Sequence, residues 1–270
     1  LPVLALACGT LAIFIIGVWD DLVSLPALPK LIAMAVVSLA VTSLGLAMTQ
    51  FDIGRHVFEL GLIVGIAGSA LWLVVVTNSV NFMDGSDGLA MGSSLAEAAS
   101  LSFLAFLTKD YTVAALALIL AGALLGLLVW NGRGKLFAGD AGALFVGFYL
   151  GGLTLLWLSK GGHSVWIGPL LFIGFLADVF MTLIWRAVKR RNLLTAHREH
   201  VYQIMLKAGV THPVVAWIFV WVTLHGALFA GISFMFPPGA STVLFAGYFL
   251  LLMIINRRIR RSALEHGHLE

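Results

Sequence analysis

Long apolar runs, almost free of charge, constrain this chain more than any other feature of its sequence. Each run carries no more than two charged residues, and the runs lie at about 2–18, 28–49, 60–78, 88–107, 112–130, 141–158, 167–186, 213–235 and 240–256. A helix needs roughly 20 apolar residues to cross a bilayer, and only helices and closed barrels satisfy their backbone there. The runs lack the alternation of barrel strands. We therefore predict an all-α, polytopic membrane helix bundle with about nine spans.

The composition supports a location in the bilayer. Of the 270 residues, 60% are hydrophobic and 11% are charged, whereas soluble domains carry about 25% charged residues. The mean hydropathy is +1.02. Cys8 is the only cysteine, so an intrachain disulfide is excluded. The chain starts inside an apolar run without an initiator Met or a basic leader, so we expect that an N-terminal portion precedes it.

Lysine and arginine predict the orientation. The connections between runs alternate between two sides, and one side holds 13 of the 16 basic residues. These are Lys30, Arg133, Lys135, Arg186, Lys189, Arg190, Arg191, Arg198, Lys207, Arg257, Arg258, Arg260 and Arg261. The other side holds Arg55, Lys109 and Lys160. The positive-inside rule places the first side in the cytoplasm.

The domain organisation follows from the same pattern. We predict one transmembrane domain, 1–256, with a cytoplasmic loop at 187–212, and a basic cytoplasmic tail, 257–270. The tail arginines are expected to attract anionic lipid. Nucleic-acid binding is not expected, because no soluble domain presents a basic face.

Acidic and carboxamide residues gather at the predicted cytoplasmic ends of the runs. They occur in "GVWDDLVSLPALPK", "NSVNFMDGSDGLAMG" and "GKLFAGDAGALFVG". The residues are Asp20, Asp21, Asn78, Asn81, Asp84, Asp87 and Asp140. One such carboxylate is readily explained as a helix cap, but capping does not require adjacent aspartates or a repeated Asn/Asp pattern. Clustered oxygen ligands suit Mg²⁺, with Mn²⁺ as the alternative.

The loop at 187–212 supplies positive charge and two histidines. Residues with helical spacing predict a short amphipathic helix along the membrane surface; they are Val201, Ile204, Met205 and Ala208. His197, Arg198 and His200 precede it and are predicted to bind an anion. A zinc site is disfavoured because no further His or Cys lies nearby.

Two ionisable residues lie deeper in the predicted spans, and such residues are functional candidates by default. We interpret Asp178 as a supporting partner of a cytoplasmic basic group rather than a metal ligand. Glu97 is interpreted as a protonated, structural residue.

Four motifs, "DDLVSLPALPK", "NSVNFMDGSDGLAMG", "FAGDAGALFVG" and "HREHVYQ", give the chain a family resemblance. In order and spacing it resembles the polyprenyl-phosphate N-acetylhexosamine-1-phosphate transferases, glycosyltransferase family 4, over about residues 15–212. The family includes undecaprenyl-phosphate GlcNAc-1-phosphate transferases and the peptidoglycan translocases that use UDP-MurNAc-pentapeptide. It usually has further spans and a conspicuous cytoplasmic loop before the Asp-Asp pair, which agrees with a missing N-terminal portion.

The resemblance implies a reaction and a location. A sugar 1-phosphate would pass from a UDP-N-acetylhexosamine to undecaprenyl phosphate, with Mg²⁺, giving a polyprenyl diphosphate-sugar and UMP. The enzyme would be a multi-pass protein of the bacterial inner membrane with its active site facing the cytoplasm. Membrane lipid would surround the enzyme. Whether it forms a homodimer is left open, because related enzymes are often dimers.

The resemblance also assigns roles to residues. The implied catalytic residues are Asp20, Asp21, Asp84, Asp87 and Asp140. The implied substrate-binding residues are Lys30, Asn78, Asn81, His197, Arg198 and His200. The implied metal ligands are Asp140 and Asp21.

Several alternatives stay open at this point. The peptidoglycan enzyme typically has three consecutive histidines where this chain has "HREHVYQ", so the branch that makes O-antigen or other surface-glycan carriers is favoured over that translocase. A secondary transporter of an anionic substrate is disfavoured, because transporters bind near the midplane and often contain repeats. A metal-dependent lipid phosphatase is the nearest enzymatic alternative. The sugar itself is not predicted.

Overall fold

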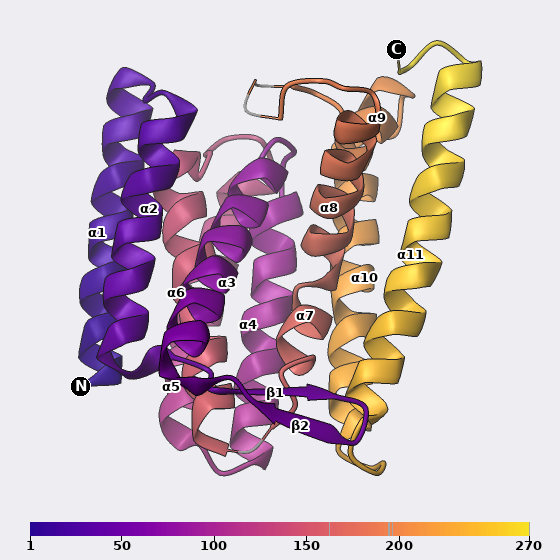
Figure 1. The fold of residues 1–270 in the computed structure, drawn as a ribbon. Coiled ribbons are helices and arrows are strands. Elements are labelled where there is room, and N and C mark those ends of the chain that lie inside the picture. Colours follow the sequence, from indigo (N-terminus) through magenta and orange to yellow (C-terminus); the bar gives the residue numbers. More distant parts are fainter. Residues whose placement is uncertain (162, 194, 196, 270) are drawn as a thin grey trace.

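The computed structural model describes residues 1–161, 163–193, 195 and 197–269, and these form a bundle of helices (Figure 1). The helices are α1 (Pro2–Val23), α2 (Ala27–Val41), α3 (Gly61–Met83), α4 (Leu89–Leu107), α5 (Tyr111–Asn131), α6 (Gly139–Gly161), α7 (Ile167–Leu171), α8 (Ile173–Val188), α9 (Val201–Lys207), α10 (His212–Ser233) and α11 (Ala240–Glu265). Eight helices of the described residues are long and apolar enough to cross a membrane. The predicted all-α membrane class is confirmed.

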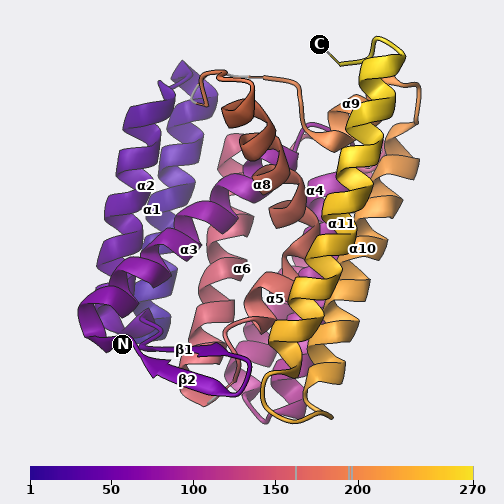
Figure 2. The same ribbon diagram turned by 45° about the vertical axis from the view of Figure 1, so that its right-hand side comes forward.

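The two ends of the bundle differ, as Figures 1 and 2 show. One end carries the connections α1–α2, α3–α4, α5–α6 and α8–α9 together with the C-terminus, and we call it the motif end. The other carries the antiparallel hairpin of β1 (Gln50–Ile53) and β2 (His56–Glu59), and we call it the hairpin end. The connections that the sequence places on the basic side therefore share one end of the molecule.

The predicted seventh span, 167–186, is wrong as a single helix. The structure breaks it at Phe172, whose φ of −96° and ψ of 14° separate α7 from α8. The break accompanies a close approach of α10, where a Cβ on Gly226 would collide with the carbonyl oxygen of Leu170. The second span is also irregular, since α2 continues into a π-helical segment, Thr42–Leu46.

The predicted C-terminal tail continues the last helix. Helix α11 continues to Glu265, so most of the predicted tail at 257–270 is helical. Arg257, Arg258 and Arg261 are exposed, as lipid attraction requires, but Arg260 is buried. Leu194 and Ala196 of the predicted loop, and Glu270 of the tail, lie outside the described residues.

Helices α4 and α6 lie at the centre of the bundle, and most of their residues are buried. The helix contacts place α1 and α3 against α6, and α5 and α10 against α4. Small residues permit the closest of these contacts. A Cβ on Gly17 of α1 would lie 2.5 Å from the Cα of Ala141 in α6, so the end of α1 touches the start of α6 through backbone.

Candidate active site

Four helix ends meet around the Lys30 ammonium at the motif end. Its Nζ lies 2.5 Å from Oδ2 of Asp20, at the end of α1, and 2.8 Å from Oδ2 of Asp140, at the start of α6. Asn81, near the end of α3, donates from Nδ2 to Oδ1 of Asp140 at 2.9 Å. The structure thus brings together four of the sequence-predicted residues, drawn from segments as far apart as Asp20 and Asp140, 120 positions along the chain.

Asp21 holds the beginning of α6 in place. Its Oδ1 accepts a hydrogen bond from the backbone amide of Asp140 at 2.8 Å, and its Oδ2 accepts one from that of Ala141 at 3.0 Å. A carboxylate is favoured there because the first amides of a helix lack partners inside the helix. Gly139, with φ +66°, leaves room for it, since a Cβ there would lie 2.8 Å from Asp21 Oδ2. Asp21 thereby fixes Asp140 relative to α1.

Asp84 lies just beyond the end of α3, where the charges of Asp140 and Asp21 act on its carboxyl group. Burial, followed by the negative charges of Asp140 and Asp21, raises the pKa of Asp84 to about 7. Its side chain forms no hydrogen bond with any residue that the structure describes. Unlike Asp20, Asp21 and Asp140, it therefore keeps both oxygens available for a ligand, as far as the described residues go.

Asp87 and Asn78 are not in this network. Oδ2 of Asp87 lies 3.9 Å from Nδ1 of His212, at the start of α10, and a Cβ on Gly134 would lie 2.8 Å from that oxygen. Asn78 donates from Nδ2 to the carbonyl oxygen of Val74, one turn earlier in α3, at 2.8 Å. Their predicted catalytic and binding roles stay predictions.

The histidine motif is docked against the end of α3. The Tyr202 hydroxyl of α9 donates to the carbonyl oxygen of Phe82 at 3.0 Å, and Gly85 leaves space for it, because a Cβ there would collide with that hydroxyl. The rings of His197 and His200 stack with centroids 5.0 Å apart. Helix α9 exists as predicted, but its apolar face packs into the protein instead of facing lipid. The histidine motif therefore lies beside the Asn/Asp motif at the end of α3.

Asp178 supports the histidine motif from α8, as the sequence indicated. Its Oδ1 accepts a hydrogen bond from the backbone amide of Val201 at 2.8 Å, and its Oδ2 lies 3.8 Å from Nδ1 of His200. Nη2 of Arg260 lies 4.0 Å from Oδ1 of Asp178 and donates to Thr182 Oγ1 at 2.6 Å. Arg260 is not predicted as part of this support, because its sequence position is among the tail arginines that are expected to attract lipid.

One sequence signal distinguishes Arg260 from its neighbours. Asn256, four residues earlier, places a polar side chain in the apolar part of α11, and its Oδ1 accepts a hydrogen bond from Arg260 Nε at 2.8 Å. A carboxamide within an otherwise apolar stretch, one turn before an arginine on the same face of a helix, indicates a buried pair rather than a lipid-facing arginine.

A pocket of about 620 Å³ lies on the side of α9 toward the C-terminus, and its lining includes Arg186, Arg198 and His268. Burial, then the charges of His200 and Arg186, lowers the pKa of His197 to about 4, so this imidazole is neutral near pH 7. Positive charge comes instead from arginines: Arg198 is exposed, and Arg186 is buried in an ion pair with Glu199. An anion would meet the arginines here, with His197 as a neutral hydrogen-bonding group.

The donor set at the motif end fits a divalent cation. Within the described residues, no three His, Cys, Asp or Glu side chains converge into a ready-made metal cage. Mg²⁺ does not need such a cage, since it commonly takes one or two carboxylates plus water and substrate phosphates. Asp84 has no hydrogen-bond partner in the part of the chain that the structure describes, and a cation would relieve its repulsion by Asp140 and Asp21. Asp84 belongs with these two as a candidate ligand.

Glu97 in α4 is separate from this site. It is 1% exposed, and neither carboxyl oxygen has a hydrogen-bond partner in the described part of the chain. A buried carboxylate without a partner is costly, so the arrangement agrees with a neutral structural residue.

Known proteins share this sequence pattern. The family model for glycosyl transferase family 4 matches residues 3–158. A probable undecaprenyl-phosphate N-acetylglucosaminyl 1-phosphate transferase of Bacillus subtilis (strain 168) is 29% identical over 77% of this chain and 59% of its own length. An undecaprenyl-phosphate alpha-N-acetylglucosaminyl 1-phosphate transferase of Yersinia pestis is 28% identical over 96% and 74%.

A third relative represents the other branch of the resemblance. The phospho-N-acetylmuramoyl-pentapeptide-transferase of Lactobacillus gasseri is 29% identical over 54% of this chain and 46% of its own length. The chain thus spans about half to three quarters of these relatives. The family match covers the Asp-Asp, Asn/Asp and "FAGDAGALFVG" motifs whose side chains meet at the motif end. The chain therefore belongs to glycosyl transferase family 4.

Proposed function

We propose that this protein transfers an N-acetylhexosamine 1-phosphate from a UDP-sugar to undecaprenyl phosphate, producing a polyprenyl diphosphate-sugar and UMP. The observation that carries the proposal is the meeting of Asp20, Lys30, Asn81 and Asp140 at four helix ends. The relatives whose names specify transfer of N-acetylglucosamine phosphate support it.

The electrostatics suit a reaction between phosphates. A donor diphosphate and a lipid phosphate repel each other, so positive charge must bring them together. Lys30 supplies one fixed ammonium, held between Asp20 and Asp140. Mg²⁺, held by Asp140 with Asp84 or Asp21, would supply the rest by screening phosphate oxygens. Mn²⁺ is the alternative ion.

Direct in-line attack by the lipid phosphate is the preferred route. A phosphate monoester has a second pKa near 6, so it is largely a dianion at pH 7 and needs no strong base. Asp20 is better placed to orient than to attack. Its Oδ1 accepts the Leu25 backbone amide at 2.6 Å, and its Oδ2 binds Lys30. A two-step route through an aspartyl-phosphate would require the attacking Asp20 oxygen to give up its own partner, either the Leu25 amide or the Lys30 ammonium.

An apolar groove offers a place for the lipid tail. It has a volume of about 660 Å³ and is lined by residues of α1, α5 and α6, among them Phe14, Leu124 and Tyr149. Ala138 and Gly142, two residues on either side of Asp140, line the same groove. A polyprenyl chain in this groove would bring its phosphate to the motif end while its tail stays in hydrocarbon.

We propose that the protein lies in the bacterial inner membrane with its motif end on the cytoplasmic side. The basic residues on this side support the orientation, and a water-soluble UDP-sugar would reach the motif end from there. Surface-glycan or O-antigen carrier synthesis is preferred to the peptidoglycan step, because "HREHVYQ" stands where the peptidoglycan enzyme typically has three consecutive histidines. Homodimer formation stays a prediction.

The decisive experiment measures UMP release by the detergent-solubilised full chain. It combines undecaprenyl phosphate, a panel of UDP-sugars, and either Mg²⁺ or EDTA. UMP that depends on metal, lipid and one donor is the expected result. Inorganic phosphate released without nucleotide would favour the phosphatase, and substrate uptake without UMP would favour the transporter.

A matched pair of variants sharpens the experiment. Asp140→Asn should lower metal-dependent UMP formation by about 100-fold or more, because it removes a charged group that positions Lys30 and the cation. Asp110→Asn is the control, since Asp110 caps α5 and pairs with Lys160 at the hairpin end. Full activity of a folded Asp140→Asn protein would remove Asp140 from the site.

A further inference from the structure

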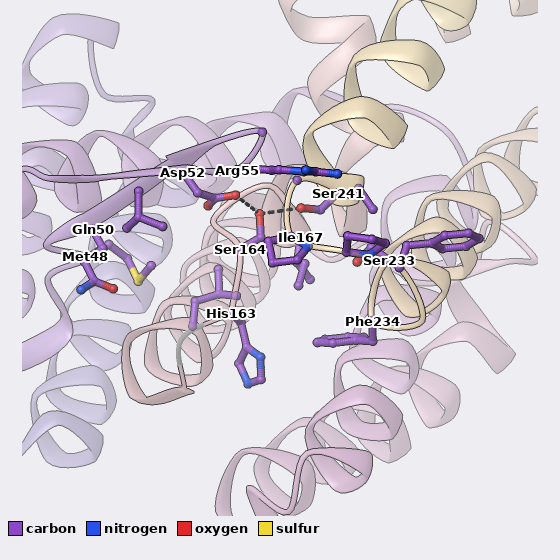
Figure 3. Close-up of a pocket in the computed structure, with 18 of the residues that line it drawn as sticks. Met48, Gln50, Asp52, Arg55, His163, Ser164, Ile167, Ser233, Phe234 and Ser241 are labelled. Carbon is purple, nitrogen blue, oxygen red and sulfur yellow. Dashed lines mark hydrogen bonds between the residues drawn. The ribbon is translucent and has the colours of Figure 1, made fainter.

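A second polar pocket lies at the hairpin end, far from the motif end. It has a volume of about 490 Å³. Three connections surround it: the β1–β2 hairpin, the α6–α7 connection and the α10–α11 connection. Figure 3 shows Asp52 and Arg55 from the hairpin, His163 and Ser164 from the second connection, and Ser241 at the start of α11. These residues play no part in the proposed transferase site.

Hydrogen bonds join the three connections, so the pocket has a defined wall. Asp52 Oδ2 accepts from the Ser164 hydroxyl at 2.6 Å, and Asp52 Oδ1 accepts from the Val165 backbone amide at 2.8 Å. Ser241 Oγ donates to Ser164 Oγ at 2.6 Å (Figure 3). Trp166 Nε1 donates to the Asp52 carbonyl oxygen at 2.6 Å. Asp52, which lines the pocket, is therefore already used in holding the wall together.

Glycine brings the hairpin turn close to the third connection. Gly54, with φ +60°, is the first of the two turn residues, and a Cβ on Gly239 would lie 2.5 Å from its carbonyl carbon. The Gly54 amide donates to Thr242 Oγ1 at 3.2 Å. This contact fixes the position of Arg55, the second turn residue, at the pocket.

Two side chains that line the pocket, Arg55 and His163, carry hydrogen-bond donors without a partner among the described residues. Arg55 is exposed and forms no ion pair or hydrogen bond with the described residues. His163 packs between rings, 4.8 Å from Trp157 and 5.6 Å from Phe234, and no hydrogen bond to its ring nitrogens occurs in the described part of the chain. Burial lowers the pKa of His163, so it is a neutral ring that offers one N–H. Among the described lining residues Asp52 supplies the carboxylate, and it already accepts two hydrogen bonds. The groups that remain free therefore favour an anionic ligand.

The surroundings of the pocket are those of a membrane surface. Val57 is 61% exposed and Phe236 is 58% exposed, and both line the pocket. Ile167 and Leu158 line its deeper side. Apolar side chains beside a free guanidinium suit a molecule with a charged head and a hydrocarbon tail. The volume also lies in the range of pockets for small organic molecules, about 300–1,000 Å³, and exceeds the needs of a single phosphate ion.

We propose that the pocket at the hairpin end binds the phosphate-bearing headgroup of a membrane lipid, with the Arg55 guanidinium and the His163 imidazole as its donors. Arginine suits this role because its fork of N–H groups matches two phosphate oxygens. The acyl chains would leave the pocket past Val57 and Phe236 into the bilayer. The site is independent of the transferase chemistry, and its ligand contacts the opposite end of the bundle.

Native mass spectrometry of the delipidated full chain tests the proposal. Phosphatidylglycerol is titrated against the parent, Arg55→Gln and His163→Gln, with a glucosyl diacylglycerol as a phosphate-free lipid. Loss of one charge-assisted contact should weaken phosphatidylglycerol binding about tenfold in Arg55→Gln. Lys109→Gln, a substitution of another exposed cation at the same end, should leave binding unchanged.

Each outcome decides the matter. Arg55 lies on an exposed turn, so Arg55→Gln should fold and should retain parental UMP release. Equal binding of phosphatidylglycerol by the parent and by Arg55→Gln would overturn the proposal. So would a parent that binds the phosphate-free lipid as tightly as it binds phosphatidylglycerol. Inorganic phosphate is added in a separate arm. If it binds in an Arg55-dependent way and phosphatidylglycerol does not, the pocket is an ion site and the lipid assignment is wrong.

Discussion

The carboxylates of the motif end differ in what holds each of them. Asp20 and Asp140 share the Lys30 ammonium, and Asp21 accepts two backbone amides at the start of α6. Asp84 has no such partner among the described residues, and Asp140 and Asp21 oppose its ionisation. These differences separate residues that organise the site from one that is ready to receive a ligand.

The raised pKa of Asp84 predicts a pH-dependent stability. Because its pKa moves from 3.8 to about 7 on folding, the folded protein holds the proton more tightly. That contribution to stability is complete below pH 3.8 and is lost as the pH rises through about 7. In EDTA, Asp84→Asn should therefore raise the unfolding temperature at about pH 8 and have less effect at about pH 5.

Asp87→Asn is the matched control for this measurement, because Asp87 faces His212 and lies in the same connection. It should not reproduce the difference between the two pH values. Thermal unfolding of both variants and the parent in one detergent provides the comparison. A parallel pH profile for Asp84→Asn and the parent would show that Asp84 is not the group responsible.

At the level of elements, the site depends on how closely α1 approaches α6. Gly17 contacts the backbone of Ala141, so a methyl group at Gly17 requires the helices to separate. Gly17→Ala should lower the stability by about 1–3 kcal/mol, the typical cost of overpacking. Gly122→Ala in α5 is the control, because open space surrounds the added Cβ. Thermal unfolding measures both, and equal stability would contradict the proposed packing.

Helix α11 is expected to act on the histidine motif through Asp178. Arg260→Met would leave Asp178 without its buried cation, which should loosen His200 and raise the KM for the UDP-sugar while changing the KM for undecaprenyl phosphate little. Arg260→Lys should restore part of the affinity. Arg261→Met is the control, since Arg261 is exposed and pairs with Glu265. A purely structural role would change both KM values alike and gain nothing from lysine.

The elements also show what could be predicted from the sequence. Most spans follow from the apolar runs, because a bilayer leaves the backbone few alternatives. The break at Phe172 could not be predicted, since it accompanies the close approach of Gly226 from another helix. The burial of Arg260 likewise depends on Thr182, 78 positions away. Local pattern identifies the helices and the motif residues, whereas their partners come from packing.

For the whole molecule, the polar groups divide between two ends with different chemistry. The motif end combines clustered carboxylates with Lys30, and its four connections come from separated parts of the chain. The hairpin end has few cations, of which Lys160 is paired with Asp110. Such a division fits a protein that meets a soluble anionic substrate on one side of a bilayer and lipid headgroups on the other.

The proposed orientation, with the motif end in the cytoplasm, predicts which end a reagent added outside the membrane can reach. With Cys8 replaced by serine, a cysteine at Glu59 on the hairpin should react with a membrane-impermeant maleimide in intact spheroplasts. A cysteine at Arg257 in α11 should react only after the membrane is permeabilised. Both positions are exposed in the fold, so accessibility depends on the side of the membrane. Labelling of Arg257→Cys from outside would reverse the orientation and place the proposed UDP-sugar site where no cytoplasmic nucleotide sugar can reach it.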